Sequence, residues 1–163
     1  MTYTATYPSP IGTIAIYCND NYLLRLDIIA DGLGELPPES PNHITGEVVE
    51  WLEAYFDGQK PAASLPLNPQ GSSFQQAVWC ELLAIPYGRT VTYGEIAQRI
   101  ADRRGLIRMS AQAVGTAVGR NPIPIIIPCH RVLPRSHKLG NYHYGIETKK
   151  FLLDLEGARY QPN

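Results

Sequence analysis

The chain has 163 residues, 44% of them hydrophobic, so it can form one ordinary domain or two small ones and is too apolar for a disordered tail. Its formal net charge of -1 excludes a histone-like polycation and an acidic solvating protein. That total conceals an asymmetry. Residues 1–71 hold two basic side chains against nine acidic ones, a net charge of -7, whereas residues 72–163 hold twelve against six, a net charge of +6. The basic part predicts a polyanionic partner.

The first 58 residues predict a small antiparallel sheet followed by one helix. Alternating polar and apolar residues separated by turn residues indicate strands over 2–7, 13–18 and 22–29. Ile44, Val48 and Leu52 then lie on one face of an amphipathic helix that ends at Asp57-Gly58. Residues 59–71 carry three prolines and no periodicity, so we expect a linker there and a second domain over 72–163.

Three helices are predicted at the start of the second domain. Ser73 and Gln76 have capping-box spacing and predict a helix up to Ile85, and Thr92 with Glu95 predicts a second over 93–100. Ser110 can cap a third over 111–118, which consists almost wholly of small residues. The loop before this third helix is basic, with Arg103, Arg104 and Arg108. Such a pair of helices fits a helix-turn-helix that brings its backbone close to a nucleic acid, but a small-residue helix buried against a neighbour fits equally well.

The segment after these helices brings a cysteine to the end of an apolar run. Residues 123–128 predict a buried strand, and Pro128 favours an extended chain up to Cys129. In a continued strand Cys129 and His130 would face opposite sides, so their cooperation requires a turn after the cysteine. Cys18 and Cys80 are predicted to be inert. Three widely spaced cysteines without a CxxC pair argue against a disulfide framework or a zinc site.

The last predicted helix, 146–156, carries an anomaly. Its face with Leu152 and Leu153 also contains Lys149 and Glu156, and a carboxylate facing a core needs a partner because an unpaired buried charge is costly. His130 and Arg131 are the suitable candidates. The alternative is that Glu156 frays into solvent at the helix end.

Read together, four strings resemble the O6-alkylguanine-DNA alkyltransferases, the methylated-DNA–protein-cysteine methyltransferases. The strings are Asn121-Pro122, Ile-Pro-Cys129-His130-Arg131-Val132, Gly140-Asn-Tyr142 and Leu-Glu156-Gly157. The resemblance implies an α/β (α+β) fold: an N-terminal antiparallel-sheet domain of ribonuclease-H-like form and a mostly helical C-terminal domain with a winged-helix-like helix-turn-helix.

The resemblance also implies DNA repair by direct reversal. In such a single-turnover reaction, a flipped-out guanine loses its O6-alkyl group irreversibly to a cysteine, here Cys129, and O4-methylthymine reacts less well. His130 acts on the cysteine through a water and is oriented by Glu156, while Asn121 is the hinge between the recognition helix and the active-site strand. No cofactor or metal is implied.

The remaining implied residues form the base pocket and the DNA surface. The pocket residues are Tyr93, Val132, Tyr142, Tyr144 and Lys149. The DNA-binding residues are Tyr93, Gly94, Gln112, Ala113, Arg103, Arg120 and Arg135. The implied partner is duplex DNA with O6-alkylguanine, bound in the minor groove with little sequence preference by a cytoplasmic monomer that contacts no membrane.

Two positions depart from the family pattern. Gln112 stands where many members have an arginine that fills the gap left by the flipped base. Tyr144 places a large ring where glycine is common, which predicts repair of methyl and poor repair of benzyl groups. Two rival functions are a non-catalytic binder of alkylated DNA, against which the presence of Cys129 counts, and a cysteine hydrolase, for which no oxyanion-hole signature is found.

Overall fold

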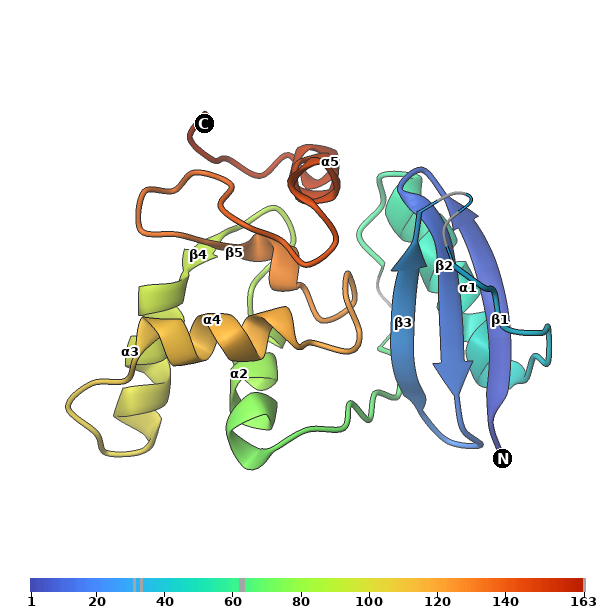
Figure 1. Ribbon diagram of the computed structural model, residues 1–163, viewed down its shortest axis with the longest axis horizontal. Coiled ribbons are helices and arrows are strands. Elements are labelled where there is room, and N and C mark those ends of the chain that lie inside the picture. Colours follow the sequence, from blue (N-terminus) through green and yellow to red (C-terminus); the bar gives the residue numbers. More distant parts are fainter. Residues whose placement is uncertain (31, 33, 62–63, 163) are drawn as a thin grey trace. The chain divides into compact units, whose positions relative to one another are not determined.

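The computed structural model describes residues 1–30, 32, 34–61 and 64–162 (Figure 1). Its internal contacts divide the chain into two compact units, Met1–Gln70 and Gly71–Asn163. Within the described residues, no helix is both long and apolar enough to cross a membrane.

The N-terminal unit is a three-stranded antiparallel sheet with one helix. The strands β1 (Tyr3–Ser9), β2 (Gly12–Cys18) and β3 (Leu23–Ile29) pair in the order β1-β2-β3, and helix α1 (His43–Phe56) contacts all three (Figure 1). The predicted meander and helix are therefore confirmed. Gly12 makes the tight β1–β2 turn possible, because its φ is +114° and a Cβ there would lie 2.5 Å from the Ile29 carbonyl oxygen.

The C-terminal unit is mostly helical. Its elements are α2 (Ser73–Leu83), β4 (Val91–Thr92), α3 (Tyr93–Arg103), α4 (Ala111–Gly119), the 3₁₀ helix η1 (Cys129–Arg131), β5 (Val132–Leu133) and α5 (Ile146–Glu156). The short strands β4 and β5 pair in parallel, with Val91 opposite Val132. Since Tyr93 directly follows β4 and Cys129 shortly precedes β5, this pairing brings the two residues to the same region.

Side-chain caps begin the first three helices of this unit. Thr92 and Glu95 form the predicted capping box, and the Ser110 hydroxyl accepts from the Ala113 N–H as expected. The predicted Ser73–Gln76 box is wrong by one residue: Ser72 is the cap and pairs with Gln75. The same spacing occurs at both places in the sequence, and the helix starts one residue earlier than its polar pattern indicates.

The strand predicted over 123–128 is also wrong, because this segment is a buried series of turns. Its backbone bonds are local: Ile127 N–H donates to the Ile123 carbonyl and Cys129 N–H to the Ile127 carbonyl. Pro124 and Pro128 cannot donate to a ladder. Ile125 takes φ +71°, a strained value for a β-branched residue. Burial of apolar side chains here therefore comes from a compact loop, which sequence periodicity does not separate from a strand.

Candidate active site

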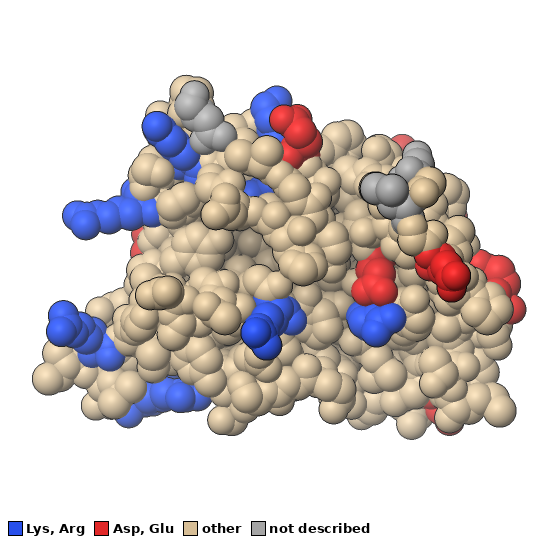
Figure 2. Space-filling model, viewed as in Figure 1, with Lys and Arg blue, Asp and Glu red and all other residues tan. Residues whose placement is uncertain are grey.

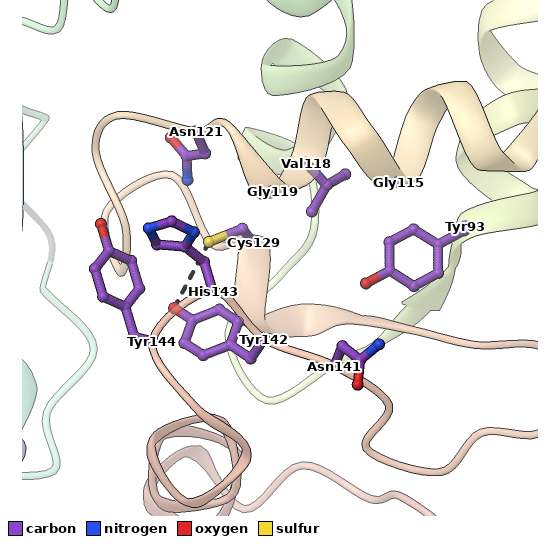
Figure 3. A pocket seen from close by; sticks show the side chains of 10 residues that line it. All are labelled: Tyr93, Gly115, Val118, Gly119, Asn121, Cys129, Asn141, Tyr142, His143 and Tyr144. Atoms are coloured by element: carbon purple, nitrogen blue, oxygen red, sulfur yellow. Dashed lines mark hydrogen bonds between the residues drawn. The ribbon is translucent and has the colours of Figure 1, made fainter.

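A cavity of about 270 Å³ opens in the C-terminal unit with the predicted acceptor cysteine in its wall (Figure 3). The residues that line it are Tyr93, Gly115, Val118, Gly119, Asn121, Cys129, Asn141, Tyr142, His143 and Tyr144. They come from the start of α3, the C-terminal half of α4, the loop after α4, the start of η1 and the loop before α5. The predicted residues Tyr93, Asn121, Cys129, Tyr142 and Tyr144 are thus brought together.

Cys129 is 5% exposed and begins the 3₁₀ turn of η1. The turn that cooperation with His130 requires is therefore present. The thiol lies 3.6 Å from the Tyr142 hydroxyl and donates toward it (Figure 3). Burial raises the pKa of Cys129, and hydrogen bonds from Asn121 and Tyr142 and the charge of Lys149 oppose this rise. The site therefore contains groups that favour the thiolate, although burial outweighs them.

Behind the cysteine, the carboxylate of Glu156 is held by His130, Arg131 and the backbone of Gly88. His130 Nε2 lies 2.6 Å from Glu156 Oε2, and Arg131 donates from Nε to Oε1 (2.8 Å) and from Nη2 to Oε2 (3.1 Å). The Gly88 N–H donates to Oε1 at 3.0 Å. Glu156 is 7% exposed. The predicted pairing of Glu156 with His130 and Arg131 is confirmed, and the alternative of fraying into solvent is wrong.

Burial and neighbouring groups shift the pKa values of Glu156 and His130 in this network. Burial alone would raise the pKa of Glu156, but the hydrogen bonds from His130 and Arg131 and the charge of Arg131 lower it to about 2. Burial lowers the pKa of His130, which favours the neutral ring. A neutral ring that donates from Nε2 to Glu156 leaves Nδ1 as an acceptor. This Nδ1 is buried and has no hydrogen-bond partner among the described residues.

Asn121 braces the loop that leads to the cysteine. Its Nδ2 donates to the Ile127 carbonyl at 2.7 Å, and its Oδ1 accepts from the Ile123 N–H at 3.0 Å. Because Asn121 lies two residues after the last residue of α4, these bonds tie the end of that helix to the strained loop and to the cysteine.

Lys149 and Val132 lie behind the cavity rather than in its wall. The Lys149 ammonium is fully buried and donates to the carbonyls of Val132 (2.8 Å) and Asn141 (3.3 Å). Burial lowers the pKa of Lys149 to about 8. The lysine thus links β5 to the loop that carries the pocket tyrosines.

The cavity wall is largely aromatic. The hydroxyl of Tyr93 points into it from one side, while Tyr142 and Tyr144 line the other (Figure 3). Tyr142 and Tyr144 meet edge to face with ring centroids 5.8 Å apart, and His143 packs against Tyr144 at 4.7 Å. Burial raises the pKa of Tyr93, so its phenol stays protonated near neutral pH.

Sequence reasoning missed five lining residues: Gly115, Val118, Gly119, Asn141 and His143. The small-residue composition of α4 was the available signal for the first three. The string Gly140-Asn-Tyr142 contained Asn141, but nothing in the sequence singled out His143.

The residues predicted to bind DNA lie mostly at the surface. Gly94, Gln112, Arg103, Arg120 and Arg135 are exposed and Ala113 is half-buried. The sequence left two interpretations open for α4, a helix buried against a neighbour and a helix exposed to nucleic acid, and each describes one of its faces. Val114, Ala117 and Val118 are buried, whereas Gln112 and Thr116 are exposed. Basic side chains predominate on the part of the surface in Figure 2 that the C-terminal unit forms.

The family comparisons cover both units. Residues 73–158 match the family described as 6-O-methylguanine DNA methyltransferase, DNA binding domain, and residues 2–69 match its ribonuclease-like domain. The methylated-DNA–protein-cysteine methyltransferase of Methanosarcina acetivorans is 40% identical over 159 residues, which is 96% of this chain and 99% of that protein. The protein of that name from Haemophilus influenzae is 38% identical over 97% of this chain and 88% of its own.

Solved structures agree with these matches. The Mycobacterium tuberculosis O6-methylguanine methyltransferase has a TM-score of 0.81 and 39% identity, covering 99% of this chain and 96% of that one. The M. tuberculosis OGT in complex with DNA has a TM-score of 0.80 and 39% identity over 95% and 92% of the two chains. The predicted two-part α+β fold is confirmed by these structures, and the chain belongs to the O6-methylguanine DNA methyltransferase family.

Proposed function

We propose that this protein repairs DNA by moving the O6-alkyl group of guanine, chiefly methyl, onto Cys129 in a single irreversible turnover. The observation that carries the proposal is the buried thiol of Cys129 in the wall of an aromatic cavity, backed by the hydrogen-bonded Glu156 and His130. The names of the similar proteins support it. The non-catalytic binder is the weaker candidate, because such a protein needs no buried thiol.

The first requirement is a nucleophile. Displacement at a saturated carbon needs the thiolate, and burial raises the pKa of Cys129, so the proton must be removed as reaction proceeds. His130 Nδ1 is the available acceptor, reached through a bridging water, and the Glu156 carboxylate stabilises the imidazolium that forms. Arg131 keeps Glu156 ionised.

The second requirement is a leaving group. As the sulfur–carbon bond forms and the carbon–O6 bond breaks, negative charge develops on the guanine. The protonated Tyr93 phenol, which points into the cavity, donates a hydrogen bond to a ring nitrogen and stabilises this charge (Figure 3). The products are S-alkyl cysteine and guanine, with the thiol proton ending on the base.

The third requirement is access to the base, which must leave the duplex to enter the cavity. Flipping costs a few kcal/mol and is cheapest for a badly paired base, which selects lesions with little sequence preference. The small residues of α4 permit close approach to the minor groove, and Gln112 occupies the gap that the flipped base leaves in the duplex. Through its hydrogen bond to Ile127, Asn121 keeps the loop that leads to the cysteine in a fixed position relative to this helix. We place the reaction on duplex DNA, by a monomer, in the cytoplasm.

The mass of the intact protein tests the function. Incubation with duplex containing O6-methylguanine should add one methyl group per molecule, located on the Cys129 peptide. Cys129→Ser should gain none and still bind the duplex, whereas Cys80→Ser, which alters an exposed cysteine, should react like the wild type. Retained binding without mass gain in the wild type would support the non-catalytic binder instead, and turnover of an ester substrate would support the hydrolase.

The cavity also limits the alkyl group. The rings of Tyr144 and Tyr142 meet in its wall, and we expect these rings to admit methyl and to hinder benzyl. O4-methylthymine should react more slowly than O6-methylguanine. Rapid labelling of Cys129 by O6-benzylguanine as the free base would contradict this size limit, and Tyr144→Gly should accelerate that labelling if the ring is the obstacle.

A further inference from the structure

The connection between α3 and α4 is unusually long and ends in an exposed apolar tip. It comprises seven residues, 104–110, which we call the α3–α4 loop, whereas helix-turn-helix motifs typically use about three or four. Ile107 at its centre is 94% exposed and the neighbouring Leu106 is 47% exposed. The enzyme chemistry described above makes no use of this tip.

Both ends of the loop are anchored. Leu106 N–H donates to the Ala101 carbonyl at 2.8 Å and Gly105, at φ +67°, closes the end of α3 in the left-handed conformation. At the other end, the Ser110 side chain caps α4. Only residues 107–109 stand between these anchors. The exposure of Ile107 is therefore a feature of a tightly held loop and not of a long unanchored segment.

The arginines beside the tip differ in how their charge is compensated. Arg103 pairs with the buried Glu81 at 2.6 Å, so its charge is largely neutralised. Arg104 lies over the Phe74 ring, which positions it without removing its charge. Arg108 is exposed and has no acidic partner among the described residues. The apolar tip is thus flanked by the uncompensated charges of Arg104 and Arg108.

We propose that the α3–α4 loop is a second DNA-contact element, in which Ile107 enters the minor groove while Arg104 and Arg108 bind phosphates on either side. An apolar tip flanked by cations matches a groove bordered by phosphates, and apolar wedges are a recurrent way to bind the minor groove. The proposal rests on the proposed function, because it takes α4 as the helix that lies along the DNA.

The reach of the loop fits this assignment. Ile107 lies three positions before Ser110, the N-cap of α4, so the tip lies at most about 11 Å beyond that helix end, or about three base-pair steps along the duplex. A duplex whose base enters the cavity beside Gly115 and Gly119 must pass the exposed face of α4. Its continuation past the start of the helix then meets the loop.

Binding and transfer assays with Ile107→Ser test the proposal. Its affinity for undamaged duplex, and its rate of methyl transfer from duplex at limiting concentration, should each fall about tenfold, the equivalent of losing about half the burial of an isoleucine side chain. Transfer from the free base O6-methylguanine needs only the cavity and should keep its rate. Leu83→Ser, which removes another exposed apolar side chain of the same unit, should change none of these values.

Arg108→Ala tests the charged part. The slope of log affinity against log salt concentration should fall in magnitude by about 1, whereas Arg25→Ala in the acidic N-terminal unit should leave it unchanged.

Three outcomes would overturn the proposal: wild-type affinity in Ile107→Ser, an equal loss with duplex and free base, or a loss confined to duplexes long enough for two copies, which would assign the tip to a contact between copies. Failure of the wild type to transfer methyl would refute the proposed function. The affinity for undamaged duplex would still decide the role of the loop.

Discussion

The two units of this protein bury different kinds of polar group. In the described part of the N-terminal unit the buried polar residues are Thr4 and Thr45, which bond to backbone within an apolar core. The C-terminal unit buries Glu81, Asn121, His130, Arg131, Lys149 and Glu156. Buried charges are costly even when paired, so they are weak devices for stability alone. The difference indicates that the first unit is organised for stability and the second for a reaction.

Removing the Glu156 charge should have the largest effect. Glu156→Gln leaves Arg131 buried without its counter-ion, so the free energy of unfolding should fall by about 3 kcal/mol. The rate of methyl transfer should fall about 100-fold or more, because a neutral amide does not stabilise the His130 imidazolium. Chemical denaturation and single-turnover assays measure the two effects, and Glu147→Gln, on the exposed side of α5, is the control. A stability loss with a normal rate per folded molecule would make the network purely structural.

This pair of units also shows where sequence reasoning succeeds. The sheet, α1 and α5 followed from periodicity because each presents one apolar face, and Glu156 was found because it violates that pattern. Periodicity did not predict the loop over 123–128. Its apolar residues are buried by a series of turns, and these turns are held by hydrogen bonds to Asn121, which lies outside the segment. The contact of Gly88 with Glu156 was not predicted either. The φ of Gly88 is +77° and a Cβ there would lie 3.0 Å from the Glu156 carbonyl oxygen, a contact between residues far apart in sequence.

Equivalent cavity-creating substitutions in the two units should have similar effects on stability and different effects on the rate of methyl transfer. Leu52→Ala in α1 and Leu153→Ala in α5 each remove a fully buried leucine, and each should lower the free energy of unfolding by about 3 kcal/mol. Leu52→Ala should leave the methyl-transfer rate per folded molecule unchanged. Leu153→Ala should lower it, because the neighbouring turn of α5 positions Glu156. Equal rate losses in both variants would contradict the division between the units.

The buried Lys149 should give the C-terminal unit a distinctive pH dependence. Burial lowers its folded pKa to about 8 from an ordinary 10.5, so between these values the unfolded chain holds a proton that the folded chain lacks. Stability from this group therefore rises with pH across the interval, by at most about 3 kcal/mol. Urea unfolding of the wild type and Lys149→Met from pH 7 to 10 measures this effect. The difference between their free energies of unfolding should change steadily as the pH rises. A difference between the two proteins that stays constant over this pH range would refute the assignment.

The smallest effect concerns the opposite surface charges of the units. Gln112→Arg adds a cation to the exposed face of α4, where it should strengthen duplex binding severalfold and steepen its salt dependence by about 0.9 in slope. It should also raise the repair rate, because a guanidinium fills the place of a flipped base better than an amide. Gln59→Arg adds the same charge to the acidic N-terminal unit. If α4 faces the duplex, binding titrations will distinguish the two variants. If the two variants strengthen binding equally, net charge alone governs the affinity, and the assignment of α4 as the recognition helix is wrong.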